Sequence, residues 1–138
     1  KTETILQQIN YCLRDEMNQV VLNIIVNAAH AISGVTNGGQ EGKGTITVST
    51  SHGDGYAEIR ISDTGGGIPE AVRNKVFDPF FTTKDVGQGD GLGLYVSQEI
   101  IDLHGGCIGV TSQPGIGTCF LICLPFANEG EPSLNPIQ

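Results

Sequence analysis

The chain has 138 residues, which is enough for one compact domain and too few for two. Its formal net charge of -8 comes from 7 basic and 15 acidic residues. Proteins that bind nucleic acids or anionic membranes usually present a basic surface, and this composition does not supply one. We expect no membrane span, because no apolar run reaches the roughly 18 residues that one needs. Of its 20 glycines, 12 lie between Gly65 and Gly117 in short clusters, which indicates specialised loops.

The first half of the chain predicts helices followed by a hairpin. Residues 1–14 form a helical lead-in, because apolar side chains recur there at helical spacing. A long helix follows from about Asp15 to Ser33, and residues 34–44 are a glycine-rich loop. The segments TITVSTS and YAEIRISD, joined through GDG, predict a strand, a turn and a second strand.

The second half of the chain alternates loops with one helix and a second hairpin. Pro69 is expected to open a short helix that runs through Val76. The segment FDPFFTTKDVGQGDG has no sustained period and predicts a long loop. A helix is expected over 92–104, stopped by two glycines, and CIGVTSQPGIGTCFLICLP predicts the second hairpin.

This order of elements predicts an α+β fold. We expect a two-layer α/β sandwich in which the helices pack on one face of a mixed, mostly antiparallel sheet. The lead-in over 1–14 precedes a single domain over 15–126, and residues 127–138 form a polar, flexible tail.

The four cysteines are Cys12, Cys107, Cys119 and Cys123. None of them forms a C-x-x-C pair. The simplest interpretation is that they are small buried hydrophobic residues in a reducing compartment. A metal site or a disulfide is the alternative.

A polar stripe runs along the long helix. At about 100° per residue, the side chains of Gln19, Asn23, Asn27 and His30 fall within an arc of roughly 80°. The other positions from 20 to 32 are almost all apolar. A solvated face would explain the stripe, although such faces normally carry Lys and Glu. A ligand is the second explanation, because carboxamide oxygens can bind a hard cation and the amide groups can face phosphate oxygens.

Three glycine segments accompany this helix. DTGGGIP follows a strand that ends at Asp63, whose carboxylate can accept a hydrogen bond from an exocyclic amine such as that of adenine. GQGDGLGL precedes a helix, where backbone N–H groups suit phosphate oxygens. PGIGT opens the last strand. Each segment taken alone is also compatible with an ordinary turn or flexible loop.

The order of these segments resembles the Bergerat ATP-binding fold of gyrase-type ATPases and sensor histidine kinases. NQVVLNIIVNAAHAI is similar to the N box of that family, and DTGGGIP to its first glycine box. FDPFFTTK resembles the phenylalanine box, GDGLGL the second glycine box and GIGTCF the third. The phenylalanine box points to the kinases, most closely those of the nitrogen-regulator type. The resemblance covers residues 18–126.

The resemblance implies roles for individual residues. Asn27 would ligate Mg²⁺, Asn23 would lie near the phosphates, and Lys84 would be a cation in the loop that covers ATP; these three would be the catalytic residues. Asp63 would accept a hydrogen bond from the adenine amine. The remaining positions implied in nucleotide binding are His30, Gly65, Gly67, Ile68, Phe80, Phe81, Gly89, Gly91, Leu92, Gly93, Leu94 and Thr118.

The resemblance also implies an activity and its partners. The domain would bind ATP with Mg²⁺ and donate the γ-phosphoryl group to a His on a dimerisation domain absent from this chain, with a response regulator downstream. We expect His30, His52 and His104 to have structural or nucleotide-binding roles and not to be that acceptor. The isolated domain should therefore have little to phosphorylate. The resemblance also implies that this domain lies in the cytoplasm and contacts neither nucleic acid nor a membrane directly. This holds whether or not the full-length protein is anchored in a membrane.

Three other functions remain compatible with the sequence. A gyrase-type ATPase would need a Glu at Asn23 to activate water, and an Asn cannot take that proton at neutral pH. A serine kinase of the anti-sigma type has a similar size, but FDPFFTTK favours a histidine kinase. A nucleotide-binding pseudokinase is favoured only by Asp90, which replaces the usual Thr of the second glycine box.

Overall fold

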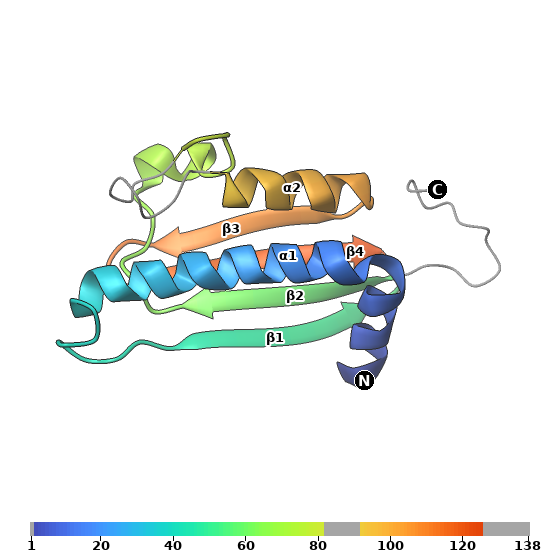
Figure 1. Ribbon diagram of the computed structural model, residues 1–138, viewed down its shortest axis with the longest axis horizontal. Coiled ribbons are helices and arrows are strands. Elements are labelled where there is room, and N and C mark those ends of the chain that lie inside the picture. Colours follow the sequence, from blue (N-terminus) through green and yellow to red (C-terminus); the bar gives the residue numbers. More distant parts are fainter. Residues whose placement is uncertain (1, 82–91, 126–138) are drawn as a thin grey trace.

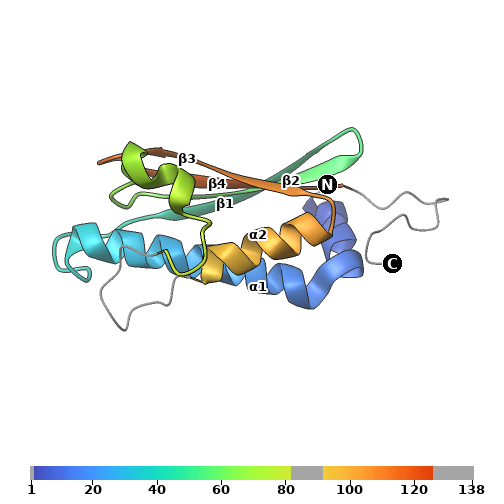
Figure 2. The same ribbon diagram turned by 90° about the horizontal axis from the view of Figure 1, so that it is seen from above.

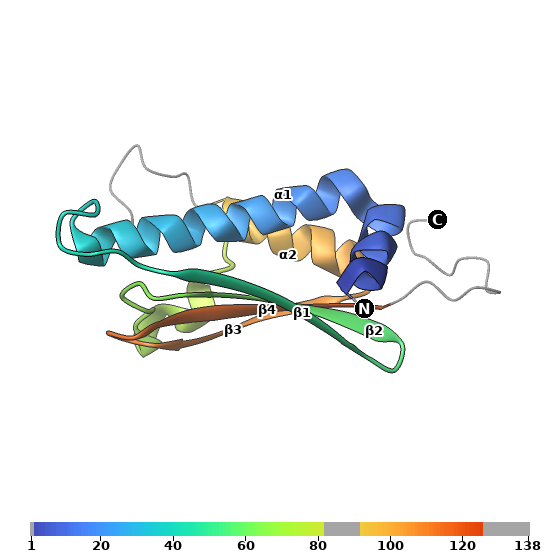
Figure 3. The same ribbon diagram turned by 90° about the horizontal axis from the view of Figure 1, so that it is seen from below.

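The computed structural model describes residues 2–81 and 92–125. Its elements are α1 (Thr2–Thr36), β1 (Ile46–Gly53), β2 (Tyr56–Asp63), the 3-10 helix η1 (Glu70–Lys75), α2 (Gly93–Leu103), β3 (Cys107–Gln113) and β4 (Gly117–Pro125). Helices α1 and α2 form one layer and the sheet forms the other (Figures 1, 2 and 3). This arrangement confirms the predicted α+β sandwich.

The four strands lie in the order β1-β2-β4-β3, and every neighbouring pair is antiparallel. The described sheet is therefore antiparallel throughout, whereas we expected some parallel pairing. The two predicted hairpins are present, and they join along β2 and β4. The register places Asp63 opposite Thr118 at one end of the sheet. At the other end it places Cys107 opposite Cys123.

The first helix is longer than expected. The lead-in and the long helix form one element, although its first turns bend away from the remainder (Figure 1). The helix also continues past Ser33 to Thr36, whose hydroxyl donates to the carbonyl of Ile32 at 2.9 Å. It ends there because Asn37 and Gly38 have φ values of 52° and 69°, which are left-handed.

The two shorter helices differ from prediction in small ways. The element after Pro69 is a 3-10 helix, and Pro69 precedes it with φ -58° and ψ 142° instead of occupying its first turn. Helix α2 begins at Gly93, one residue later than expected, and His104 caps its end. Gly105, with φ 76°, then turns the chain toward β3.

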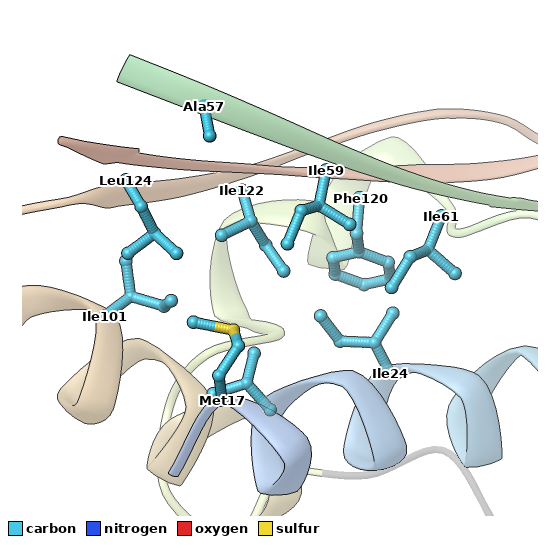
Figure 4. Close-up of a cluster of buried hydrophobic side chains, with 10 residues drawn as sticks. Met17, Ile24, Ala57, Ile59, Ile61, Ile101, Phe120, Ile122 and Leu124 are labelled. Atoms are coloured by element: carbon cyan, nitrogen blue, oxygen red, sulfur yellow. The ribbon is translucent and has the colours of Figure 1, made fainter. Parts of the chain in front are cut away.

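The core lies between the two layers and gathers side chains from both (Figure 4). Alternate residues of β2 and β4 face the helices and are buried, as the period of a strand requires. Its fully or nearly fully buried members are Met17, Val20, Ile24, Ala57, Ile59, Ile61, Ile101, Phe120, Ile122 and Leu124. Each large aliphatic side chain buried in this way contributes about 1.5–3 kcal/mol.

Contrary to the expectation from the sequence, the segment Asp15–Thr36 of α1 is long and apolar enough to cross a membrane by length and composition. The core helices of globular proteins pass the same test. Here Val20, Ile24 and Ala28 are buried in the structure. We therefore treat this helix as a core element of the domain.

Candidate functional site

The carboxyl group of Asp63 is buried at the end of β2. The residue is only 9% exposed. The backbone N–H of Gly65 donates to its Oδ1 at 2.8 Å, and the backbone of Thr118 provides a second hydrogen bond. Burial raises the pKa of Asp63 above 3.8, although the two backbone hydrogen bonds oppose the shift. A carboxylate held in this way keeps oxygen lone pairs available for a further donor.

Thr118 and Ser112 form the part of the site next to Asp63. Thr118 is 7% exposed, and its hydroxyl lies 2.9 Å from the hydroxyl of Ser112. The backbone N–H of Ile68 donates to Ser112 Oγ at 2.7 Å, and Arg73 donates to the Ser112 carbonyl at 3.0 Å. Ser112 was not predicted from the sequence, although an inward-facing Ser next to PGIGT could have indicated it.

Close packing requires a glycine at both position 65 and position 67. A Cβ at Gly65 would lie 2.6 Å from the Cβ of Ala31, so the loop could not pack on α1. Gly67 has φ +80°, and a Cβ there would lie 2.5 Å from the carbonyl oxygen of Gln113. These contacts hold the loop after β2 against α1 and against the β3–β4 turn, which fixes the backbone next to Asp63.

Asn23, in the polar stripe of α1, joins α1 to α2. Its amide donates to the Gly93 carbonyl at 3.1 Å and to Ser97 Oγ at 3.3 Å. Its carbonyl oxygen accepts a hydrogen bond from Gln19 at 3.1 Å. Ser97, fully buried, also donates to the Gly93 carbonyl at 2.8 Å and was not predicted. Asn23 therefore holds the first turn of α2, a contact absent from the sequence-based expectation.

Asn27 and His30 continue the stripe toward the end of α1 that lies near Asp63. Both residues are half-buried. The Nδ1 atom of His30 is buried and has no hydrogen-bond partner among the described residues. A buried polar atom in this state is costly unless a ligand or an ordered water satisfies it. The end of the stripe at His30 therefore has room for a further hydrogen-bond donor or acceptor.

The aromatic residues before the undescribed segment divide into two kinds. Phe77 packs edge-on against Phe120 with ring centroids 6.2 Å apart. Phe80 is 71% exposed and has φ 68°, so its ring lies outside the core. Phe81 is half-buried. Only Phe77 is tied to the core.

The remaining predicted residues fall into two groups. Gly93 and Leu94 lie in the first turn of α2, where Leu94 packs on the core and the Leu92 carbonyl accepts from Val96 at 2.8 Å. Lys84, Gly89 and Gly91 lie outside the described residues, as does Asp90. Within the described ranges, no group of three His, Cys, Asp or Glu side chains is arranged to hold a metal ion.

Asn23→Asp should loosen the junction between the helices. A carboxylate oxygen would replace the amide donor and face the Gly93 carbonyl, so we expect the free energy of unfolding to fall by about 1–3 kcal/mol. Asn18→Asp adds the same charge at an exposed position of the same helix, and should change stability by less than about 0.5 kcal/mol. Urea unfolding measures both. Equal effects of the two variants would contradict this role of Asn23.

The chain is thus an α+β domain in which a buried carboxyl lies beside a glycine loop and near a polar helical stripe. A family model described as "Histidine kinase-, DNA gyrase B-, and HSP90-like ATPase" matches residues 12–128. The chain belongs to this family.

Curated relatives of the chain are sensor kinases. It is 42% identical over 122 residues to the signal transduction histidine-protein kinase AtoS of Escherichia coli (strain K12), covering 88% of this chain and 18% of AtoS. It is 40% identical over 111 residues to the sensor histidine kinase ZraS of Klebsiella oxytoca, covering 80% of this chain and 22% of ZraS. The chain thus spans about a fifth of the length of these two relatives.

The fold matches solved sensor-kinase structures. The mycobacterial sensor histidine kinase MprB superposes with a TM-score of 0.67 at 32% identity, covering 81% of this chain and 73% of that one. Full-length ShkA in complex with AMPPNP gives 0.68 at 28% identity, covering 86% and 23%. The chain is an ATP-binding catalytic domain of the two-component sensor histidine-kinase type. The finer likeness to nitrogen-regulator kinases stays a prediction.

Proposed function

We propose that this domain binds Mg-ATP between α1 and the ends of β2 and β4, and that its γ-phosphoryl group is passed to a histidine on another domain. One observation carries the proposal: the carboxyl of Asp63 is buried, yet two backbone N–H groups hold it in place beside the buried Thr118. Such a carboxylate suits the exocyclic amine of adenine. ShkA, a relative of known structure, was solved with AMPPNP, which is consistent with this ligand class.

The polar stripe of α1 suits the phosphate end of the ligand. Asn27 offers a neutral carboxamide oxygen, which is a hard donor of the kind that Mg²⁺ accepts. Mg²⁺ usually takes few protein ligands and fills its shell with water and phosphate oxygens, so one carboxamide is a sufficient anchor. The Nδ1 of His30 has no hydrogen-bond partner within residues 2–81 and 92–125, which fits a site that is completed by a ligand. Bound Mg²⁺ would neutralise phosphate charge as the phosphoryl group departs.

Other residues of the site have positioning roles in this proposal. Asn23 keeps the start of α2 against α1 through Gly93 and Ser97, so the backbone there is fixed before ATP arrives. Gly65 and Gly67 fix the loop beside Asp63 by close packing. Preorganisation of this kind lowers the cost of ordering the site on binding. Lys84, Gly89 and Gly91 would complete the phosphate contacts.

The partners follow from the proposed reaction. The bond between the γ-phosphorus and the β,γ-bridging oxygen breaks, a bond from phosphorus to an imidazole nitrogen forms, and ADP leaves. The acceptor would lie on the dimerisation domain of the same full-length protein, and a response regulator would receive the phosphoryl group next. ATP is an intracellular substrate, so we place this domain in the cytoplasm.

The function is tested by ATP binding and by transfer. We expect the isolated domain to bind ATP more tightly with Mg²⁺ than without it. After addition of the histidine-bearing dimerisation domain, acid-labile phosphate should appear on that partner. Steady phosphate release by the domain alone would instead indicate a gyrase-type ATPase. Mg-dependent binding without transfer would indicate a pseudokinase.

A further inference from the structure

Two cysteines face each other across the sheet at the end opposite to Asp63. Cys107 begins β3 and Cys123 lies near the end of β4, and the register makes them direct Cα partners. Directly opposed residues of antiparallel strands have Cα atoms about 4.5–5.5 Å apart, and disulfides span about 4.4–6.8 Å. A bond between the two sulfur atoms therefore needs no change in strand register.

The pair lies on the face of the sheet that the helices leave uncovered. Ile122 and Leu124, the neighbours of Cys123 in β4, are buried in the core, so Cys123 points to the opposite face. Cys107 is exposed and Cys123 is half-buried. The expectation that the cysteines are small buried residues is therefore wrong for Cys107. Both thiols are free in this structure, and small solutes can reach Cys107.

The two thiols interact electrostatically. Burial raises the pKa of Cys123 to about 11, with smaller contributions from a side-chain hydrogen bond with Cys107 and from the charges of Cys107 and Glu58. Cys123 therefore stays protonated at neutral pH. The exposed Cys107 is then the sulfur that meets a reagent first, because reactivity follows thiolate character and access.

We propose that Cys107 and Cys123 form a redox-active site that a small peroxide converts into a cross-strand disulfide. The Cys107 thiolate attacks one peroxide oxygen and the O–O bond breaks, which leaves a sulfenic acid on Cys107 and one water after protonation. The Cys123 sulfur then attacks the Cys107 sulfur, the S–O bond breaks, and the thiol proton leaves with the hydroxide as a second water. The two thiols lose two electrons and the peroxide gains them.

The first step prepares the second. The sulfenic acid places an oxygen on the Cys107 sulfur, and that oxygen is the leaving group when the sulfur of Cys123, its direct partner across the two strands, attacks. The resulting bond is exposed, and exposed disulfides are the ones that cellular thiols reduce most readily. The site is therefore suited to reversible oxidation.

The pair is separate from the nucleotide site. Cys123 lies five residues along β4 from Thr118, the partner of Asp63, which is roughly 17 Å of strand. Oxidation should therefore leave ATP affinity within about twofold, and the thiol measurement itself requires no nucleotide.

Thiol counting on the full chain tests the proposal. The folded protein is treated with hydrogen peroxide, quenched and unfolded for titration; we expect two of its four thiols to disappear, without dimers, and to return with dithiothreitol. Cys107→Ser and Cys123→Ser should each abolish the intramolecular crosslink. Cys119→Ser is the matched control, because it removes a half-buried thiol from the same strand and face, and should leave the crosslink unchanged.

Peptide mapping identifies the bond directly. No Lys or Arg follows Lys84, so trypsin leaves the last three cysteines in one peptide, but chymotryptic cleavage after Phe120 separates Cys107 from Cys123. We expect these two peptides to be linked. Loss of the crosslink in Cys119→Ser or Cys12→Ser, equal oxidation of all four thiols, or linkage only between chains would overturn the proposal.

Discussion

Asp63→Asn is expected to reduce ATP affinity on the order of tenfold to a hundredfold. The amide of Asn can present a donor where the carboxylate presents an acceptor, and a hydrogen bond to a charged group is worth about 1.5–3 kcal/mol. Inosine triphosphate carries a carbonyl in place of the adenine amine. The variant should therefore lose much of its preference for ATP over inosine triphosphate, and calorimetry with both nucleotides measures this ratio.

The same substitution should not destabilise the fold at neutral pH. The pKa of Asp63 is raised in the folded state, so its stabilising contribution is present below pH 3.8 and is lost as the pH rises through the folded-state value. Ionised Asp63 therefore costs stability at pH 7, and Asn removes this cost. We expect a free energy of unfolding at pH 7 that equals or exceeds that of the parent, with a gain that shrinks in acid. A variant that unfolds at pH 7, or keeps its base preference, would contradict the assignment.

Asn27→Ala is expected to remove most of the Mg-dependent part of ATP binding. Loss of one metal ligand, at about 3 kcal/mol, corresponds to an affinity lower by on the order of a hundredfold. The parent should bind ATP much more weakly after addition of a chelator, whereas the variant should bind about equally with and without Mg²⁺. Fluorescence titration with a labelled ATP in both conditions provides the comparison.

Asn18→Ala is the matched control for this measurement. It makes the same chemical change on the same helix at an exposed position. It should leave both affinities and the thermal midpoint close to those of the parent. If Asn27→Ala still responds to Mg²⁺ as the parent does, the metal lies elsewhere and the role of the stripe must be reassigned.

The fold was largely predictable because its signals are local. Alternating burial in β2 and β4 follows directly from the alternation of apolar residues in YAEIRISD and GTCFLICLP. The end of α1 was less predictable. The hydroxyl of Thr36 donates to the Ile32 carbonyl and accepts from the Gly39 N–H, so the helix runs past Gly34, whereas the glycine-rich sequence predicted a loop from that residue. The 3-10 geometry after Pro69 was missed for a similar reason, since its tethers come from Ser112 in another strand.

The candidate site was predictable in composition but not in its contacts. Asp63 and Thr118 were both named from their motifs, and the register makes them partners. Asn23 was expected near phosphate, whereas its amide is already bonded to Gly93 and Ser97 of α2. Such contacts join residues 70 or more positions apart, and no local pattern encodes them.

The sequence alone determined the polar stripe, the glycine motifs and the class of fold, because these depend on the order and period of neighbouring residues. Tertiary structure decided which stripe residue holds α2, which glycines are required by packing, and which thiols face each other. Cys107 and Cys123 are separated along the chain, and only the antiparallel register of β3 and β4 brings them together. Pairing across a sheet is set by the whole core, which fixes the register by burying one face of each strand.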